Sequence, residues 1–162
     1  MTERQIKPFP ISWDEFHRHA KALAWRLDGI GEWTGLVAVT RGGLVPALVV
    51  ARELGIKHIE TVCVSSYHGQ DLEKADILKP LELPEGGKGW LIVDDLVDTG
   101  HTARIVRKML PNAHYATVYS KPKGREMVDT FVTEFSQDTW LDFPWDIENQ
   151  LTYAQPIREG AD

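Results

Sequence analysis

Residues 91–102 of the chain read Leu-Ile-Val-Asp-Asp-Leu-Val-Asp-Thr-Gly-His-Thr, and this stretch is the most informative part of the sequence. The apolar run 91–93 is typical of a strand buried on both faces of a parallel sheet, and the polarity changes abruptly at Asp94. Open α/β sheets bind their ligands at the carboxyl ends of the strands. The acids therefore mark a candidate ligand-binding edge of the predicted sheet.

The residues that follow the acids are suited to a phosphate group. Thr99 and Thr102 supply hydroxyls and Gly100 supplies a permissive backbone, just before a helix predicted at about residues 102–110. Free backbone N–H groups at the start of a helix bind phosphate. The two carboxylates suit ribose hydroxyls and a hard cation such as magnesium.

Other readings of this stretch are weaker. The chain has no G-x-x-x-x-G-K-[ST] loop, and no G-x-G-x-x-G opens a helix after a strand. The acids could instead form a solvated turn, with Asp98 only capping the next helix. That alternative explains neither the paired acids nor the Thr-Gly-x-Thr sequence after them.

The rest of the chain alternates between predicted helices and strands. A capping box at Ser12 and Glu15 predicts the start of the first helix. Helices are predicted at about residues 12–27, 44–54 and 102–110, and strands at about 36–39, 60–65, 91–93 and 114–120, followed by a short apolar run at 130–135. This order predicts an α/β fold, in which a mostly parallel twisted sheet is flanked by helices. Residues 1–162 are predicted to form one domain.

Two segments do not fit this alternation. The connection at residues 67–89 is long for a compact domain and is predicted to be a mobile loop over the site. Residues 137–157 contain Trp140, Trp145 and other aromatic residues without helical or strand periodicity. They are predicted to form a small irregular hood.

Composition limits the function classes. The net charge of −6 argues against non-specific binding to nucleic acid. Cys63 is the single cysteine and cannot form an internal disulfide, which favours a reducing compartment. The N-terminal residues lack the apolar core of a signal peptide, and no stretch approaches the roughly 18 apolar residues of a membrane span. We therefore expect a cytoplasmic protein.

Two motifs resemble those of a known family. Four apolar residues, two acids, two apolar residues and Asp-Thr-Gly-x-Thr, at residues 90–102, resemble the ribose-phosphate signature of the phosphoribosyltransferases. Residues 39–46, Val-Thr-Arg-Gly-Gly-Leu-Val-Pro, resemble the pyrophosphate loop of the purine salvage enzymes. From Ser12 to Pro156 the chain resembles the bacterial xanthine-guanine phosphoribosyltransferases.

The resemblance implies the type I phosphoribosyltransferase fold and an activity. Xanthine or guanine, and hypoxanthine less well, would react with 5-phosphoribosyl 1-pyrophosphate (PRPP) to give XMP, GMP or IMP and pyrophosphate, with Mg²⁺ as cofactor. The resemblance also implies a homo-oligomer, a tetramer in relatives. The alternatives are a transferase for another base and a non-catalytic regulator that senses PRPP with the same fold.

The resemblance assigns the PRPP half of the site. Arg41 and Gly42 would bind pyrophosphate, with a cis peptide bond between them as in relatives. Asp95 would also be the partner of magnesium, directly or through water. The ribose and 5'-phosphate would be held by Asp94, Asp95, Leu96, Val97, Asp98, Thr99, Gly100, His101 and Thr102.

The resemblance also assigns the purine half. Asp98 would be the catalytic residue near purine N7, and Lys121 would donate to O6. Trp140 would stack on the base and the Leu141 backbone would contact the purine edge, whereas Trp145 is expected to pack structurally. The alternatives are a solvated Lys121 and an ordinary core role for Trp140.

The chain departs from the family at the mobile loop. Relatives carry an arginine there over the pyrophosphate, but residues 68–79 contain none. Lys74 or Lys79 would have to take the place of this arginine. A lysine ammonium supplies the positive charge but cannot make the two parallel hydrogen bonds of a guanidinium group. The resemblance further implies a weak peripheral contact with the cytoplasmic face of the inner membrane. The sequence itself shows neither a basic amphipathic helix nor a lipidation signal for such a contact.

Overall fold

The computed structural model describes residues 7–65 and 76–146. In chain order, the elements are β1 (Lys7–Pro10), α1 (Trp13–Asp28), β2 (Gly35–Thr40), α2 (Leu44–Leu54), β3 (Ile59–Ser65), β4 (Asp76–Lys79), the 3₁₀ helix η1 (Pro84–Gly87), β5 (Trp90–Val97), α3 (His101–Met109), β6 (His114–Ser120), the 3₁₀ helix η2 (Arg125–Met127), β7 (Thr133–Glu134) and β8 (Thr139–Asp142).

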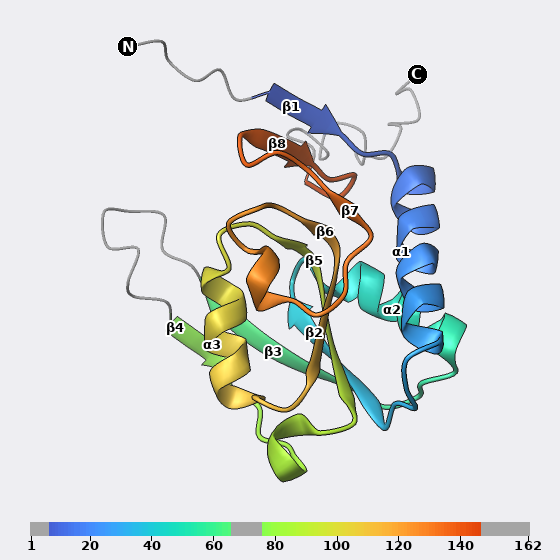
Figure 1. Cartoon of the computed structure of the whole chain (residues 1–162), viewed down its shortest axis with the longest axis vertical. Helices are drawn as coiled ribbons and strands as arrows, with labels where there is room; N and C mark the ends of the chain where they lie inside the picture. Colours follow the sequence, from blue (N-terminus) through green and yellow to red (C-terminus); the bar gives the residue numbers. More distant parts are fainter. Residues whose placement is uncertain (1–6, 66–75, 147–162) are drawn as a thin grey trace, which may run out of the picture.

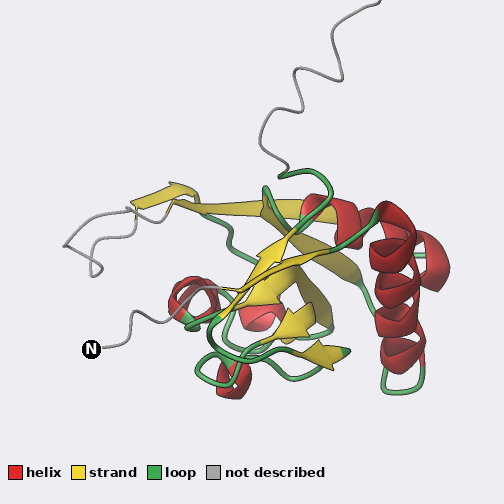
Figure 2. Ribbon diagram, turned by 90° about the horizontal axis from the view of Figure 1, so that it is seen from above, coloured by secondary structure: helices red, strands yellow, loops and turns green. Residues whose placement is uncertain are grey.

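The centre of the molecule is a six-stranded sheet in the order β4-β3-β2-β5-β6-β7. The pairings along it are parallel except for β4, which runs antiparallel to β3 at the edge. Helices α1 and α2 cover one face and α3 covers the other (Figures 1 and 2). This arrangement confirms the predicted α/β fold with a mostly parallel sheet.

The two faces of the sheet bury two apolar clusters. Leu36 and Ala38 of β2 pack into the cluster under α1 and α2, while Val37 and Val39 pack into the cluster under α3. A strand that is buried on both faces needs apolar residues at successive positions. This requirement explains the continuous apolar runs in the sequence.

Each of the three α-helices begins and ends within one residue of the predicted bounds. The Ser12 hydroxyl accepts a hydrogen bond from the Glu15 backbone N–H at 3.1 Å, which caps α1. Helix α2 ends at Gly55, whose φ of 68° is the left-handed conformation that favours glycine. Within the two described ranges, no helix is both long and apolar enough to cross a membrane.

Three segments differ from the prediction. Strand β5 does not stop at Val93 but continues through both acids to Val97. The predicted connection 67–89 contains β4 and η1, and its residues 67–75 lie outside the described part. The predicted irregular hood contains β8, which pairs in parallel with β1 as a separate two-stranded sheet. Short strands of this kind depend on distant partners, so they leave little periodicity in the sequence.

Candidate active site

Three neighbouring strands bring the predicted site residues to one edge of the sheet. Strands β2, β5 and β6 lie side by side and parallel, and they end at Thr40, Val97 and Ser120. The segments that follow these strands therefore meet at the same edge. They carry Arg41, the phosphate loop and Lys121.

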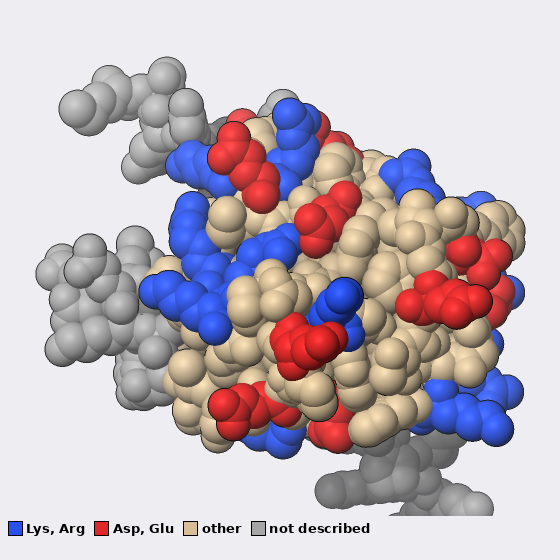
Figure 3. Space-filling view, turned by 60° about the horizontal axis from the view of Figure 1, so that its bottom comes forward, with Lys and Arg blue, Asp and Glu red and all other residues tan. Residues whose placement is uncertain are grey.

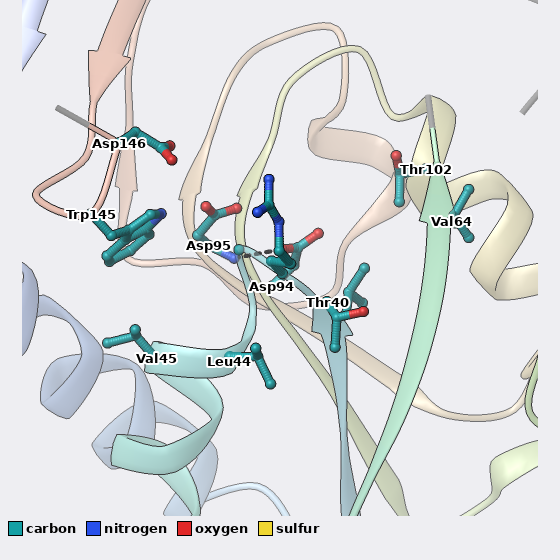
Figure 4. A pocket seen from close by; sticks show the side chains of 12 residues that line it. Thr40, Leu44, Val45, Val64, Asp94, Asp95, Thr102, Trp145 and Asp146 are labelled. Atoms are coloured by element: carbon teal, nitrogen blue, oxygen red, sulfur yellow. Dashed lines mark hydrogen bonds between the residues drawn. The ribbon is translucent and has the colours of Figure 1, made fainter. Parts of the chain in front are cut away.

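A cavity of about 580 Å³ opens at this edge. Asp94 and Asp95 lie between Trp145 and Asp146 on one side and Thr102 and Val64 on the other (Figure 4). The lining residues are Val39, Thr40, Arg41, Gly42, Leu44, Val45, Val64, Asp94, Asp95, Thr102, Trp145 and Asp146. The structure thus brings together five of the predicted PRPP residues around one cavity.

The loop after β2 passes so close to the Asp95 carboxylate and to strand β5 that it has no room for side chains at two positions. A Cβ atom on Gly42 would lie 2.5 Å from the Asp95 carboxylate, and one on Gly43 would lie 2.5 Å from the Val93 carbonyl oxygen. Only glycine fits at such distances. The loop also contains a cis peptide bond, which joins Thr40 to Arg41. The expectation of a cis bond between Arg41 and Gly42 was wrong by one residue.

The acid pair is poorly solvated. Burial raises the pKa of Asp94 well above its usual value, and the neighbouring Asp95 carboxylate adds to this. Burial also raises the pKa of Asp95, from 3.8 to about 6, and the charge of Asp146 across the cavity acts in the same direction. Backbone N–H groups compensate in part, with Asp95 N–H donating to Asp94 at 2.8 Å and Leu96 N–H to Asp95 at 2.7 Å. A carboxylate pair that is only partly compensated favours a cation or hydroxyl donors beside it.

The acids fit a magnesium ion that is shared with a ligand. Mg²⁺ prefers oxygen ligands and usually keeps waters and substrate phosphates in its shell. Among residues 7–65 and 76–146, no three acidic, histidine or cysteine side chains are grouped closely enough to hold a metal. Asp95, with Asp94 beside it, would therefore supply only part of the coordination.

The phosphate loop leads directly into α3. Gly100 has a φ of 87° at the N-cap, and no side chain caps the helix. The N–H groups of the first turn of α3 are therefore available to an anion. The loop is tightly packed, because a Cβ atom on Gly124 would lie 2.7 Å from the Asp98 carbonyl oxygen. Helix α3 begins at His101, one residue before the predicted start.

A second group of polar residues lies at the other end of this loop. The ammonium of Lys121 is buried, 4% of the residue being exposed, and it donates to Asp98 Oδ2 at 3.2 Å. The side-chain amide of Gln137 donates to Asp98 Oδ1 at 2.6 Å. The two predicted purine residues Asp98 and Lys121 are thus in contact. The alternative of a solvated Lys121 is wrong.

The two tryptophans have different surroundings. Trp140 lies on β8 and is 61% exposed, so the alternative of an ordinary core tryptophan is wrong. Leu141, the next residue, has a buried side chain. Trp145 stacks on Phe143 with ring centroids 4.9 Å apart and meets Phe16 edge-on at 4.8 Å. Trp145 packs as expected, but it also lines the cavity.

Only one of the two lysines proposed to replace the loop arginine lies within the described residues. Lys79 lies on β4, where its ammonium donates to the Thr61 carbonyl oxygen at 2.5 Å, so it is bound to the sheet. Lys74 lies outside the described residues.

Two residues of the candidate site, Asp146 and Gln137, were not predicted from the sequence. Asp146 follows the Pro-Trp pair and joins the cavity only because the chain turns back after β8. Gln137 stands 39 residues after Asp98 in the sequence, and no local pattern connects the two. The available signal for Gln137 was its position three residues before Trp140, the residue predicted to stack on the base.

Comparison with known proteins identifies the family. The sequence model of the phosphoribosyl transferase domain matches residues 12–151. The chain therefore belongs to the phosphoribosyl transferase domain family, whose enzymes transfer a pentosyl group.

Several solved structures of phosphoribosyltransferases share this fold. A purine phosphoribosyltransferase from Pyrococcus horikoshii is 29% identical with a TM-score of 0.76, over 87% of this chain and 95% of that chain. A xanthine-guanine-hypoxanthine phosphoribosyltransferase from Helicobacter pylori is 19% identical with a TM-score of 0.68, over 86% and 94%. A hypoxanthine phosphoribosyltransferase from Trypanosoma cruzi is 24% identical with a TM-score of 0.60, over 76% and 74%. The last two show the shared fold alone.

Proposed function

We propose that this chain is a purine salvage enzyme that transfers the phosphoribosyl group of PRPP to xanthine or guanine, and to hypoxanthine less well. The observation that carries the proposal is the contact between buried Lys121 and Asp98, 3.2 Å apart beside the phosphate loop. An ammonium can only donate hydrogen bonds. It therefore suits a purine with an oxo group at position 6 and disfavours adenine, whose 6-amino group is also a donor.

The geometry also supports a mechanism. Loss of pyrophosphate leaves positive charge on the ribose ring and negative charge on the departing group, so catalysis is mostly electrostatic and positional. Arg41, exposed at the cavity rim, would hold the departing pyrophosphate. Asp94 and Asp95 would accept hydrogen bonds from the ribose hydroxyls, and the loop at residues 98–102 would hold the 5'-phosphate.

Asp98 would act at the purine. Its two oxygens accept hydrogen bonds from Lys121 and Gln137, and each oxygen keeps a lone pair for a further donor. A purine N7–H could occupy that position and lose its proton as N9 forms the new bond. Trp140, exposed on β8, would cover one face of the base, and the Leu141 backbone would contact its edge.

Magnesium fits the acid pair. Enzymes of this kind commonly bind PRPP with Mg²⁺, and the half-buried carboxylates have raised pKa values that a cation would lower. When bound, the ion would offset the negative charge of the diphosphate. Asp95→Ala should weaken PRPP binding at high magnesium and make little difference in EDTA. An effect that is the same at all magnesium concentrations would remove the metal role from Asp95.

The decisive experiment is a comparison of bases. Purified protein is supplied with PRPP, Mg²⁺ and xanthine, guanine, hypoxanthine or adenine in turn, and nucleotide and pyrophosphate are measured. We expect XMP and GMP at the highest kcat/KM, less IMP and no AMP. A preference for adenine or for a pyrimidine would contradict the proposed substrate.

The same experiment tests the regulator alternative, which predicts PRPP binding without pyrophosphate release. On the face shown in Figure 3, basic and acidic side chains are both spread over the surface, in contrast to the single-sign basic surface typical of nucleic-acid binding. We further propose a homotetramer in the cytoplasm, which light scattering can test at micromolar concentration. Any contact with the membrane would be peripheral.

A further inference from the structure

We propose that Gln137 is a positioning residue that holds the Asp98 carboxylate in its working orientation. The inference rests on the proposed role of Asp98 at the purine. The carboxylate is half-exposed, with 49% of the side chain accessible, so packing alone does not fix its rotation. Two side-chain donors fix it instead. Lys121 binds Oδ2 at 3.2 Å and Gln137 binds Oδ1 at the shorter distance of 2.6 Å.

The orientation of the Gln137 amide is itself determined. Its carbonyl oxygen Oε1 accepts a hydrogen bond from the Lys123 backbone N–H at 2.9 Å. A backbone N–H can only donate, so the oxygen must face Lys123 and the NH₂ group must face Asp98. The amide therefore cannot turn its oxygen toward the carboxylate without breaking both bonds.

Gln137 also connects two parts of the site that are far apart in the sequence. Asp98 follows β5, whereas Gln137 stands two residues before β8, the strand that carries Trp140. The bond thus ties the proposed base-stacking strand to the proposed catalytic carboxylate. Without it, Lys121 would be the only charged or amide side chain holding Asp98 among the described residues, and the carboxylate could rotate toward it.

The test uses two substitutions of Gln137 in the full-length protein. Gln137→Leu removes the donor and the acceptor. Gln137→Glu keeps the shape and the acceptor for the Lys123 N–H, but replaces the donor by a second negative charge. A hydrogen bond to a charged group is strong enough that we expect kcat/KM for the purine to fall about tenfold with leucine, and further with glutamate at pH 8. The KM for PRPP should change less than about twofold.

A neighbouring substitution separates this role from loosening of the chain. The Ser136 hydroxyl lies 2.7 Å from Asp138 Oδ1 and 2.7 Å from Thr139 Oγ1, in the same turn but without contact with Asp98. Ser136→Ala should leave kcat/KM within about twofold of the wild type. Equal losses in Ser136→Ala and Gln137→Leu would mean that the turn matters and the donor does not.

A double-mutant cycle of Gln137 and Asp98 distinguishes an effect that acts through Asp98 from a general effect on the structure. If Gln137 acts through Asp98, Gln137→Leu should have no further effect on turnover of radiolabelled purine in an Asp98→Ala background. Additive losses would overturn the proposal, as would full activity of both Gln137 variants. If Gln137→Leu does not fold, the isosteric Gln137→Glu alone decides the question. Wild-type protein that makes no nucleotide would instead overturn the proposed function.

Discussion

The carboxylate of Asp95 occupies the space into which a side chain on residue 42 would extend, so only Gly42 fits there. A Cβ atom on residue 42 would lie 2.5 to 2.9 Å from all three atoms of the carboxyl group. The loop that follows β2 and the acids at the end of β5 therefore position each other. A substitution in the loop should therefore displace the acids, and a substitution of the acids should displace the loop.

The first prediction follows from this arrangement. In Gly42→Ala the new methyl group would push Asp95 away from its position, so the KM for PRPP should rise about tenfold or more. Steady-state kinetics with PRPP varied at saturating purine measure the effect. Gly55→Ala is the control, since a Cβ atom there has open space and only the strain of a positive φ. It should lower stability and leave the KM for PRPP unchanged. Equal KM values in both variants would contradict the prediction.

The second prediction concerns Asp98. The Asp98→Asn side chain keeps the shape of aspartate and can still accept the hydrogen bond from Gln137. It lacks the negative charge, however, and so cannot accept a proton from the purine. We expect kcat to fall by about 10²-fold or more while PRPP binding is retained. Single-turnover kinetics and equilibrium binding of PRPP measure the two quantities separately. Unchanged single-turnover rates would remove Asp98 from the chemistry.

The third prediction is a dependence of stability on pH. The pKa of Asp94 is raised in the folded protein, so the folded state holds its proton at pH values where the unfolded state has lost it. Stability therefore falls as the pH rises from about 4 through the raised pKa. Asp94→Asn removes this cost and should raise Tm at pH 8 in EDTA, by about 2–4 °C per kcal/mol gained.

The gain from Asp94→Asn should shrink toward zero at pH 4, where the wild-type carboxyl is protonated in the folded state. Thermal unfolding at both pH values measures it. Asp28→Asn, at the exposed end of α1, is the control and should change Tm little at either pH. A gain that is the same at pH 4 and pH 8 would show that solvation of the acid is not its cause.

The fourth prediction compares the two tryptophans. Base–aromatic stacking contributes roughly 1–3 kcal/mol, so Trp140→Ala should raise the KM for the purine by one to two orders of magnitude without lowering Tm. Trp145→Ala should lower Tm, because its ring packs against Phe143 and Phe16. If Trp145→Ala selectively impairs purine binding and Trp140→Ala unfolds the protein, the stacking residue has been assigned to the wrong tryptophan.

The central elements could be predicted because their signals are local. Helix α2 lies between two glycines, and β6 is a continuous run of strand-forming residues, so both have the predicted bounds. Strand β5 was predicted too short for a physical reason. The acids at its end point into a cavity, so polarity changes at Asp94 although the backbone remains extended to Val97.

The elements and site residues that could not be predicted from the sequence depend on contacts between distant segments of the chain. Strand β1 has only four residues and forms because β8 lies beside it. Gln137 and Asp146 reach the site through the path of the chain around β8, which no periodicity encodes. The predicted phosphate loop and the loop after β2 could be proposed from the sequence because each carries its polar residues within a few consecutive positions.

The pairing of β1 with β8 has a consequence for the order in which the protein assembles. Lys7 pairs with Thr139, so nearly the whole chain must be synthesised before the first strand meets its partner. Contacts between such distant segments close a large loop and form late, after more local pairings. The central sheet, which carries the acids and the predicted phosphate loop, pairs with neither strand. The hood that carries Trp140 is therefore expected to form last during biosynthesis, and with it the part of the cavity wall that Trp145 and Asp146 supply.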